Sequence, residues 1–256
     1  MNQYEHHIFY EMQKWHQEMS QLPTPVNKVT KSVQKKIQNI IPEKVHQAIT
    51  VAIKQTTRAV IFGADATNPK PLVNQSLELI EGKVKERINF YCSTASVEGA
   101  ITGAGGIISG LADFPLWLAL KMKMLFEIAA AYGYDTKDYK ERVYLLHIFQ
   151  LTFSSQQHRN KIYDIVCDWK KQKELLPEDI NEFDWRTFQI EYRDYIDLAK
   201  LLQLIPGVGA VVGAYVNHKY TDRLGNAAMN AYRMRRYIGK DQLRIDGSEA
   251  YLIEDN

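Results

Sequence analysis

The chain has 256 residues, of which 45% are hydrophobic and 24% are charged, and its formal net charge is +2. This composition is typical of a folded globular protein. It excludes a disordered chain and a nucleic-acid-binding protein that relies on a strong overall positive charge. The two cysteines, Cys92 and Cys167, stand in no CxxC or metal-ligand spacing. We therefore expect a reduced, cytoplasmic protein without a disulfide framework. Residues 1–15 also lack the basic-then-apolar order of a secretory signal.

The N-terminal region is predicted to be a helical arm. Apolar side chains recur every three or four residues over residues 2–20, as on one face of a helix. These side chains are Ile8, Met12, Trp15 and Met19. Two prolines at positions 23 and 25 then end the helix, because proline disfavours the helical conformation in the residue before it. We expect residues 1–25 to form an arm on the main domain.

Basic residues dominate the next segment. Between residues 26 and 61 there are seven lysines and arginines and one acid. The pattern predicts two amphipathic helices, over 26–40 and 42–62, with exposed basic faces. Such faces are either solvated or contact anionic lipid, whereas no RNA-binding motif accompanies the lysines. The lysines assigned to a membrane contact are Lys28, Lys31, Lys35 and Lys36.

Further helices follow from the same periodicity. A long helix is expected from residue 72 into a glycine-rich segment, and other helices over 136–155, over 157–171 and from residue 184. In the long helix an apolar stripe faces the core, and the charged residues are expected on the exposed side. These charged residues are Glu78, Glu81, Lys83, Lys85, Glu86 and Arg87. No alternating strand pattern is found, so the sequence predicts an all-α protein.

The most unusual segment lies between Glu98 and Lys121. It is apolar, contains five glycines and carries one charge, Asp113. At a rise of about 1.5 Å per residue, it is long enough to cross a hydrocarbon core of about 30 Å. Asp113 and Pro115 oppose a permanent span, because a charge in the bilayer is costly and proline breaks helices. The other interpretations are a buried helical hairpin, which we favour, and a reversible membrane contact.

Asp113 has two interpretations. Aspartate is a preferred N-cap and proline suits a first helical turn, so Asp113 and Pro115 predict the corner of the hairpin, followed by a helix over 114–132. The alternative is a partly buried carboxylate with a raised pKa, acting as a base and paired with Glu98 or His147.

A second glycine-rich apolar segment spans residues 201–217. It contains Pro206, Gly209 and Gly213, and a basic helix that ends near residue 239 follows it. Small residues four apart let helices approach closely. The two glycine-rich segments are therefore expected to pack on each other, on lipid or on a partner helix.

Sequence motifs for catalysis are weak. The glycines match neither a P-loop nor a dinucleotide-binding fingerprint, and no HExxH motif is present. Ser154, Ser155 and His158 could share one helical turn, but nothing in the sequence supplies an oriented base or oxyanion donors. We expect no cofactor and no metal.

The glycine-rich motifs resemble those of a known family. The run EGAITGAGGIISGLADFPLWLALKMKMLFEIAAAYGYD (98–135) and the later IPGVGAVVGAYVN (205–217), followed by a basic helix ending AYRMRR, resemble the EcsC protein family. The resemblance extends from about Lys31 to Arg236 and implies no catalytic residue. It implies a bacterial context, because the founding members resemble products encoded beside the subunits of an ABC-type exporter linked to protein secretion. The motif positions are Gly103, Gly106, Gly110, Asp113, Pro115, Tyr132, Gly133, Pro206, Gly209, Gly213 and Asn217.

The sequence thus predicts an all-α helical bundle built around two glycine-rich apolar helical hairpins. We expect an arm (1–25), an EcsC-like domain (26–239) and a tail (240–256). The expected function is that of a cytoplasmic accessory protein, peripheral at the inner face of the plasma membrane and linked to an ABC-type transport or secretion system. It would work by binding an anionic membrane surface or transporter subunits, and not nucleic acid. The alternatives are a hydrolytic enzyme centred on Asp113 and a lipid- or hydrophobe-binding module. The predicted binding residues are Gly103, Gly106, Gly110, Asp113, Pro206, Gly209, Gly213 and Asn217.

Overall fold

The computed structural model confirms the all-α class: every regular element in the residues it describes is helical. Those residues are 3–20, 43–62, 69–72, 75–103, 106–154, 156–184, 188 and 210–237. The helices are α1 (Gln3–Ser20), α3 (Glu43–Phe62), α4 (Leu77–Gly103), α5 (Gly106–Ala131), α6 (Tyr139–Phe153), α7 (Gln156–Cys167), α8 (Trp169–Glu174) and α11 (Ala210–Tyr237), with a short 3-10 turn, η2 (Ile180–Glu182). None of these helices is long and apolar enough to cross a membrane.

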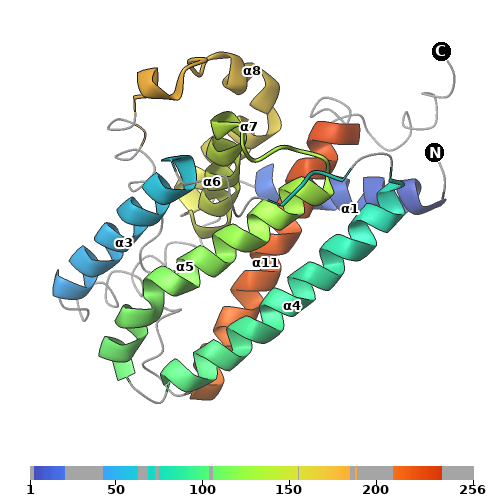
Figure 1. Ribbon diagram of the computed structural model, residues 1–256. Helices are drawn as coiled ribbons and strands as arrows, with labels where there is room; N and C mark the ends of the chain where they lie inside the picture. Colours follow the sequence, from blue (N-terminus) through green and yellow to red (C-terminus); the bar gives the residue numbers. More distant parts are fainter. Residues whose placement is uncertain are drawn as a thin grey trace, which may run out of the picture.

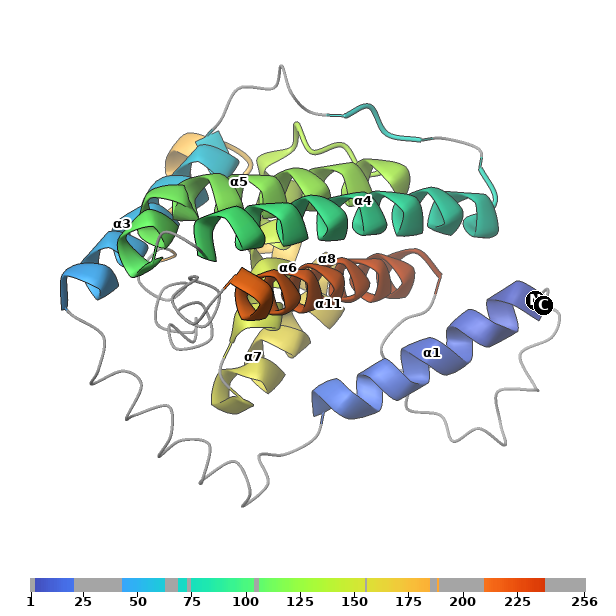
Figure 2. The ribbon, with the colours of Figure 1, turned by 90° about the horizontal axis from the view of Figure 1, so that it is seen from below.

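Three long helices, α4, α5 and α11, form the frame of the molecule. The Trp117 indole of α5 meets Asn217 of α11, so these two helices run in the same direction from their N-terminal turns. Helix α4 runs the opposite way, because Glu81 near its start pairs with Arg233 near the end of α11. Figure 2 shows α4 and α5 side by side in one layer, with α11 beneath them and α1 and α7 beyond α11.

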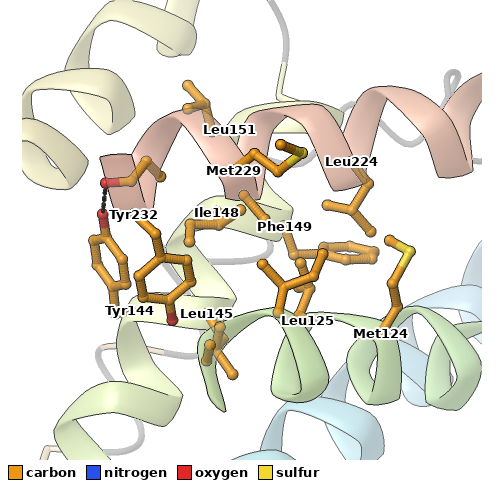
Figure 3. Packing of buried hydrophobic residues seen from close by; sticks show 14 of the residues in the cluster. Met124, Leu125, Tyr144, Leu145, Ile148, Phe149, Leu151, Leu224, Met229 and Tyr232 are labelled. Carbon is orange, nitrogen blue, oxygen red and sulfur yellow. Dashed lines mark hydrogen bonds between the residues drawn. The ribbon is translucent and has the colours of Figure 1, made fainter. Parts of the chain in front are cut away.

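Helix α6 lies at the centre of the fold (Figure 1). All its residues except His147 are buried, including charged ones such as Glu141 and Arg142. Figure 3 shows its apolar side chains between those of α5 and α11, with Phe149 near Leu125 and Leu224. Helix α6 is thus enclosed by α11, α7, α3 and α5, and its apolar side chains form part of the core.

Local signals explain several helix ends. The Asp138 carboxylate accepts a hydrogen bond from the Lys140 N–H at 2.9 Å and caps the start of α6. Gly133, which follows α5, has a φ of 90°, the left-handed conformation that favours glycine at a helix end. Arg142 joins α6 to the end of α3 through a 3.1 Å hydrogen bond to the Ile61 carbonyl.

Close packing of α4 on α11 depends on one glycine. A Cβ atom added at Gly225 would lie 2.6 Å from Cγ1 of Ile88 and 3.0 Å from its Cγ2. These atoms branch directly from the Ile88 Cβ and cannot swing away, so a side chain at Gly225 would push the helices apart. Gly82, in contrast, faces open space.

Two predictions were wrong. Helix α4 ends at Gly103 and α5 begins at Gly106, so Asp113 lies inside α5 and does not cap it. Pro115 also lies inside this helix, on its exposed side, and neither residue ends it. Glu81 was expected to be exposed but has no exposed surface, because Arg233 supplies it with a buried partner. The predicted helix over 26–40, the lysines assigned to membrane contact and most of the segment 184–209 lie outside the described residues.

Candidate functional site at the glycine-rich end of the bundle

The described glycine-rich segments meet at one end of the frame. Since α5 and α11 run parallel and α4 runs against them, the C-terminal turn of α4 and the N-terminal turns of α5 and α11 lie together (Figures 1 and 2). We call this the glycine-rich end. It comprises residues 99–103, 106–117 and 210–217.

The structure places the predicted site residues as follows. Gly103 ends α4, and Gly106, Gly110 and Asp113 lie in the first turns of α5. Gly213 and Asn217 lie in the first turns of α11. These residues therefore belong to the same end of the bundle, whereas Pro206 and Gly209 lie outside the described residues.

A buried polar layer closes this end towards the core. The Trp117 Nε1–H donates a hydrogen bond to the Asn217 Oδ1 at 2.6 Å, and Asn217 is 3% exposed. The Thr221 hydroxyl donates to the Asn217 carbonyl at 2.7 Å. Buried amide groups need hydrogen-bond partners. The Asn217 side chain of α11 finds its partner in the Trp117 indole of α5, and this hydrogen bond links the two helices.

Lys121 lies in the same layer. It is 1% exposed, and its Nζ lies 5.1 Å from the centre of the Trp117 ring, within range of a cation–π interaction. Sequence reasoning treated Lys121 only as the end of an apolar run. The signal that could have found it is its spacing: Trp117 and Lys121 are four residues apart and so share one helical face.

Cys92 lies near this layer but is not a reactive thiol. Its Sγ lies 3.8 Å from the His218 carbonyl oxygen. Burial, followed by the Asp222 charge, raises the pKa of Cys92 to about 11, although the Lys121 charge opposes the shift. The thiol therefore stays protonated at neutral pH, and a nucleophilic role for it is disfavoured.

Aromatic side chains pack against the Trp117 indole of this polar layer. The Trp117 ring stacks on Phe114 at a centroid distance of 5.5 Å and meets Phe153 edge-on at 5.8 Å. Phe153 in turn stacks on Tyr220 of α11. Such packing fixes the position of the Trp117 indole, and with it the hydrogen bond to Asn217.

Exposed apolar side chains are found among the described residues at the glycine-rich end. Leu116 on α5 is 57% exposed and Tyr215 on α11 is 66% exposed. Pro115 and Ala119 on α5 are also exposed. The described residues of this end thus place exposed apolar side chains outside a buried polar layer, an arrangement suited to binding.

His147, the predicted alternative partner of Asp113, lies elsewhere. Its ring contacts Trp169 and Phe188 and shares a 3.2 Å hydrogen bond with Gln150. Burial lowers the pKa of His147 to about 4, so it is neutral at pH 7. Within the described parts of the chain, no group of three His, Cys, Asp or Glu side chains could hold a metal ion.

Comparisons with known proteins identify the family. The model of the EcsC protein family matches residues 6–237. The chain belongs to the EcsC protein family. The match begins within α1, earlier in the chain than the glycine-rich motifs alone indicate.

Two relatives come from Bacillus subtilis (strain 168). Protein EcsC is 39% identical over 229 residues, which cover 89% of this chain and 94% of the relative. The uncharacterized protein YdbA is 34% identical over 170 residues, covering 66% of this chain and 60% of YdbA. No solved structure matches the chain.

Proposed function

We propose that this EcsC family member is a peripheral accessory protein that binds a membrane surface through the glycine-rich end of its bundle. The observation that carries the proposal is the exposure of Leu116 and Tyr215, at 57% and 66%, on the first turns of two parallel helices. Exposed large apolar side chains such as these two are suited to enter the interface of a bilayer.

Helix polarity favours an anionic membrane. The N-termini of α5 and α11 both point to the glycine-rich end, and the C-terminus of α4 is there too. Each N-terminus carries about half a positive charge and each C-terminus about half a negative one. The partial charges of two N-termini and one C-terminus sum to about half a positive charge at this end. A net positive partial charge attracts the acidic headgroups of anionic lipids. The basic residues Lys28, Lys31, Lys35 and Lys36 would add to this attraction.

The link to an ABC-type transport or secretion system is part of the proposal. It rests on the family resemblance, because the similarity to Protein EcsC establishes membership and not a partner. A rigid bundle with an apolar end could dock on a membrane subunit as well as on lipid. The protein would then act as an accessory component on the inner face of the plasma membrane, by binding and without a chemical step.

Vesicle flotation tests the proposal. The full-length protein is expected to float with vesicles containing phosphatidylglycerol and to bind phosphatidylcholine vesicles less well. Leu116→Glu and Tyr215→Glu should each weaken the partition coefficient by about tenfold or more, because burying one large apolar side chain is worth about 1.5–3 kcal/mol.

Leu79→Glu is the matched control. Leu79 is 49% exposed on the first turn of α4, at the opposite end of the frame. This substitution introduces the same charge and should leave flotation unchanged. If Leu79→Glu weakens binding as much as Leu116→Glu does, or if the unaltered protein ignores both vesicle types at low salt, the glycine-rich end is not a membrane-binding surface.

A further inference from the structure

A stripe of exposed side chains runs along α3. It consists of Val51, Lys54, Arg58 and Phe62, which follow one another at intervals of three or four residues and so lie on one line of the helix surface. All four are exposed, Val51 to 50% and Phe62 to 44%. We call these four residues the α3 stripe. The other side of the helix belongs to the core through residues such as Ile53, so the stripe faces away from the bundle.

The charges of the α3 stripe are of one sign. Among the described residues, neither Lys54 nor Arg58 pairs with a carboxylate. The other described residues that α3 exposes are uncharged, and they are Gln47, Gln55 and Ala59. The stripe therefore carries two positive charges between two large apolar side chains. This combination complements an anionic surface that also admits apolar groups.

Two opposite sides of the bundle differ in charge. Helix α3 has three basic residues and one acid, whereas α1 has three acids and one lysine. In Figure 2, α3 lies beside α5 in the layer of α4 and α5, and α1 lies beyond α11 on the opposite side. An anionic surface would therefore attract the α3 side of the bundle and repel the α1 side.

The direction of α3 brings its start towards the glycine-rich end. Arg142, near the start of α6, bonds to the Ile61 carbonyl at the end of α3. Helix α6 begins at Tyr139, soon after α5 ends at Ala131. The ends of α3 and α5 therefore lie on the same side, and the two helices, which are in contact, run in the same direction (Figure 1). The first turns of both helices thus lie towards one end of the bundle.

We propose that the α3 stripe binds the headgroups of anionic phospholipids, as a second membrane contact beside the glycine-rich end. The inference rests on the proposed membrane function and adds to it the part of the protein that recognises lipid charge. Lys54 and Arg58 extend their charged groups to the headgroup phosphates, while Val51 and Phe62 enter the interface. The acidic α1 then points away from the membrane, which sets the orientation of the bundle.

Vesicle flotation of the full-length protein at low salt tests the stripe. The double variant Lys54→Gln/Arg58→Gln should bind vesicles of phosphatidylcholine and phosphatidylglycerol about 25-fold less tightly, because each cation near an anionic surface contributes about fivefold in affinity. Its binding to pure phosphatidylcholine vesicles should equal that of the unaltered protein. Added salt should shrink the difference on the anionic vesicles, since salt screens the attraction between surface charges.

The double variant Lys170→Gln/Lys171→Gln is the matched control. Both lysines are exposed on α8, which the ion pair between Lys173 and Asp138 joins to the start of α6, away from the glycine-rich end. This variant removes the same charge and should float like the unaltered protein. Equal losses for the two double variants would show that only the net charge of the protein matters, and would overturn the inference.

The Leu116→Glu variant separates this inference from the proposed function. If Leu116→Glu weakens flotation and Lys54→Gln/Arg58→Gln does not, the glycine-rich end binds the membrane and the inference about the α3 stripe is overturned. If only Lys54→Gln/Arg58→Gln weakens flotation, the stripe binds lipid and the glycine-rich end does not. If the unaltered protein floats with neither vesicle type, both proposals fail.

Discussion

Basic side chains at least partly enclosed by this fold are of two kinds. Two arginines in the last turns of α11 each donate two hydrogen bonds to a buried carboxylate. Arg233 donates to Glu81, and Arg235 donates to Glu141. Arg159 on α7 and His147 on α6 are partly buried; among the described residues, the enclosed Nε of Arg159 has no hydrogen-bond partner, and His147 bonds to the Gln150 amide. Burial acts on all four groups in the same direction, so their differences come from their partners.

The pKa values separate the two kinds. Burial alone would lower the pKa of Arg233, but hydrogen bonds from Arg233 to Glu81 and the charge of that carboxylate reverse the effect and raise it. The pKa of Arg235 is raised in the same way by Glu141. Without such partners, burial lowers the pKa of both Arg159 and His147. The comparison indicates that the paired cations hold the fold, whereas His147, without a carboxylate partner, is neutral at pH 7.

The Glu81–Arg233 pair is the most completely satisfied of these sites. Tyr4 of α1 donates to a Glu81 oxygen at 2.8 Å, and Tyr132 donates to the other at 3.1 Å. Arg233 also donates to Glu11 of α1 at 2.9 Å. Four segments far apart in the sequence thus converge on one buried ion pair, which fixes α1 against the frame.

The largest expected effect follows from breaking this pair. Arg233→Gln should lower the free energy of unfolding by about 3–5 kcal/mol, because it leaves the Glu81 carboxylate buried without its counter-charge. Urea denaturation followed by circular dichroism measures the change.

The exposed pair between Arg87 and Glu127 is the control. Its atoms also lie 2.7 Å apart, but the Arg87 side chain is 50% exposed. Arg87→Gln should therefore cost no more than about 1 kcal/mol. A similar cost for both variants would show that burial does not distinguish these ion pairs.

The sequence predicted the helices better than their contacts. The stripe on α1 is buried as expected, and so is the predicted α4 stripe of Leu77, Ile80, Val84, Ile88 and Tyr91, because periodicity alone decides which face is apolar. Glu81 was misassigned because its partner, Arg233, is 152 residues away. Its position next to Ile80 and three residues before Val84, both fully buried, was nevertheless a sign that it lies on the inner face.

The candidate site was predictable only in part. Asn217 was predicted as a binding residue only because it belongs to the second glycine-rich motif. Its structural role could not be predicted, because it depends on Trp117, which lies 100 residues earlier in the chain. The hairpin corner was misplaced since Asp113 and Pro115 match a helix start in isolation. In the structure α4 ends at Gly103 and α5 begins at Gly106, seven residues before Asp113.

The next effect concerns His147 and the dependence of stability on pH. The folded pKa of His147 is about 4, below the ordinary value of 6.5, so on acidification the unfolded chain takes up the proton first. This residue should therefore reduce stability as the pH falls from about 6.5 to about 4, by up to about 3 kcal/mol. His147→Gln should flatten that part of the profile relative to the unaltered protein, measured by urea denaturation at each pH. If both profiles fall equally, the imidazole is not buried as a neutral group.

The smallest effect is the one that completes the comparison. Arg159→Gln should change the free energy of unfolding by no more than about 0.5 kcal/mol, or raise it slightly. The reason is that the substitution removes a cation whose enclosed Nε has no hydrogen-bond partner among the described residues and which lies at the positive end of α7. Arg58→Gln, on the exposed face of α3, gives the baseline for losing one arginine. A loss for Arg159→Gln as large as that for Arg233→Gln would place Arg159 among the structural cations, and the difference between the two kinds of buried charge would disappear.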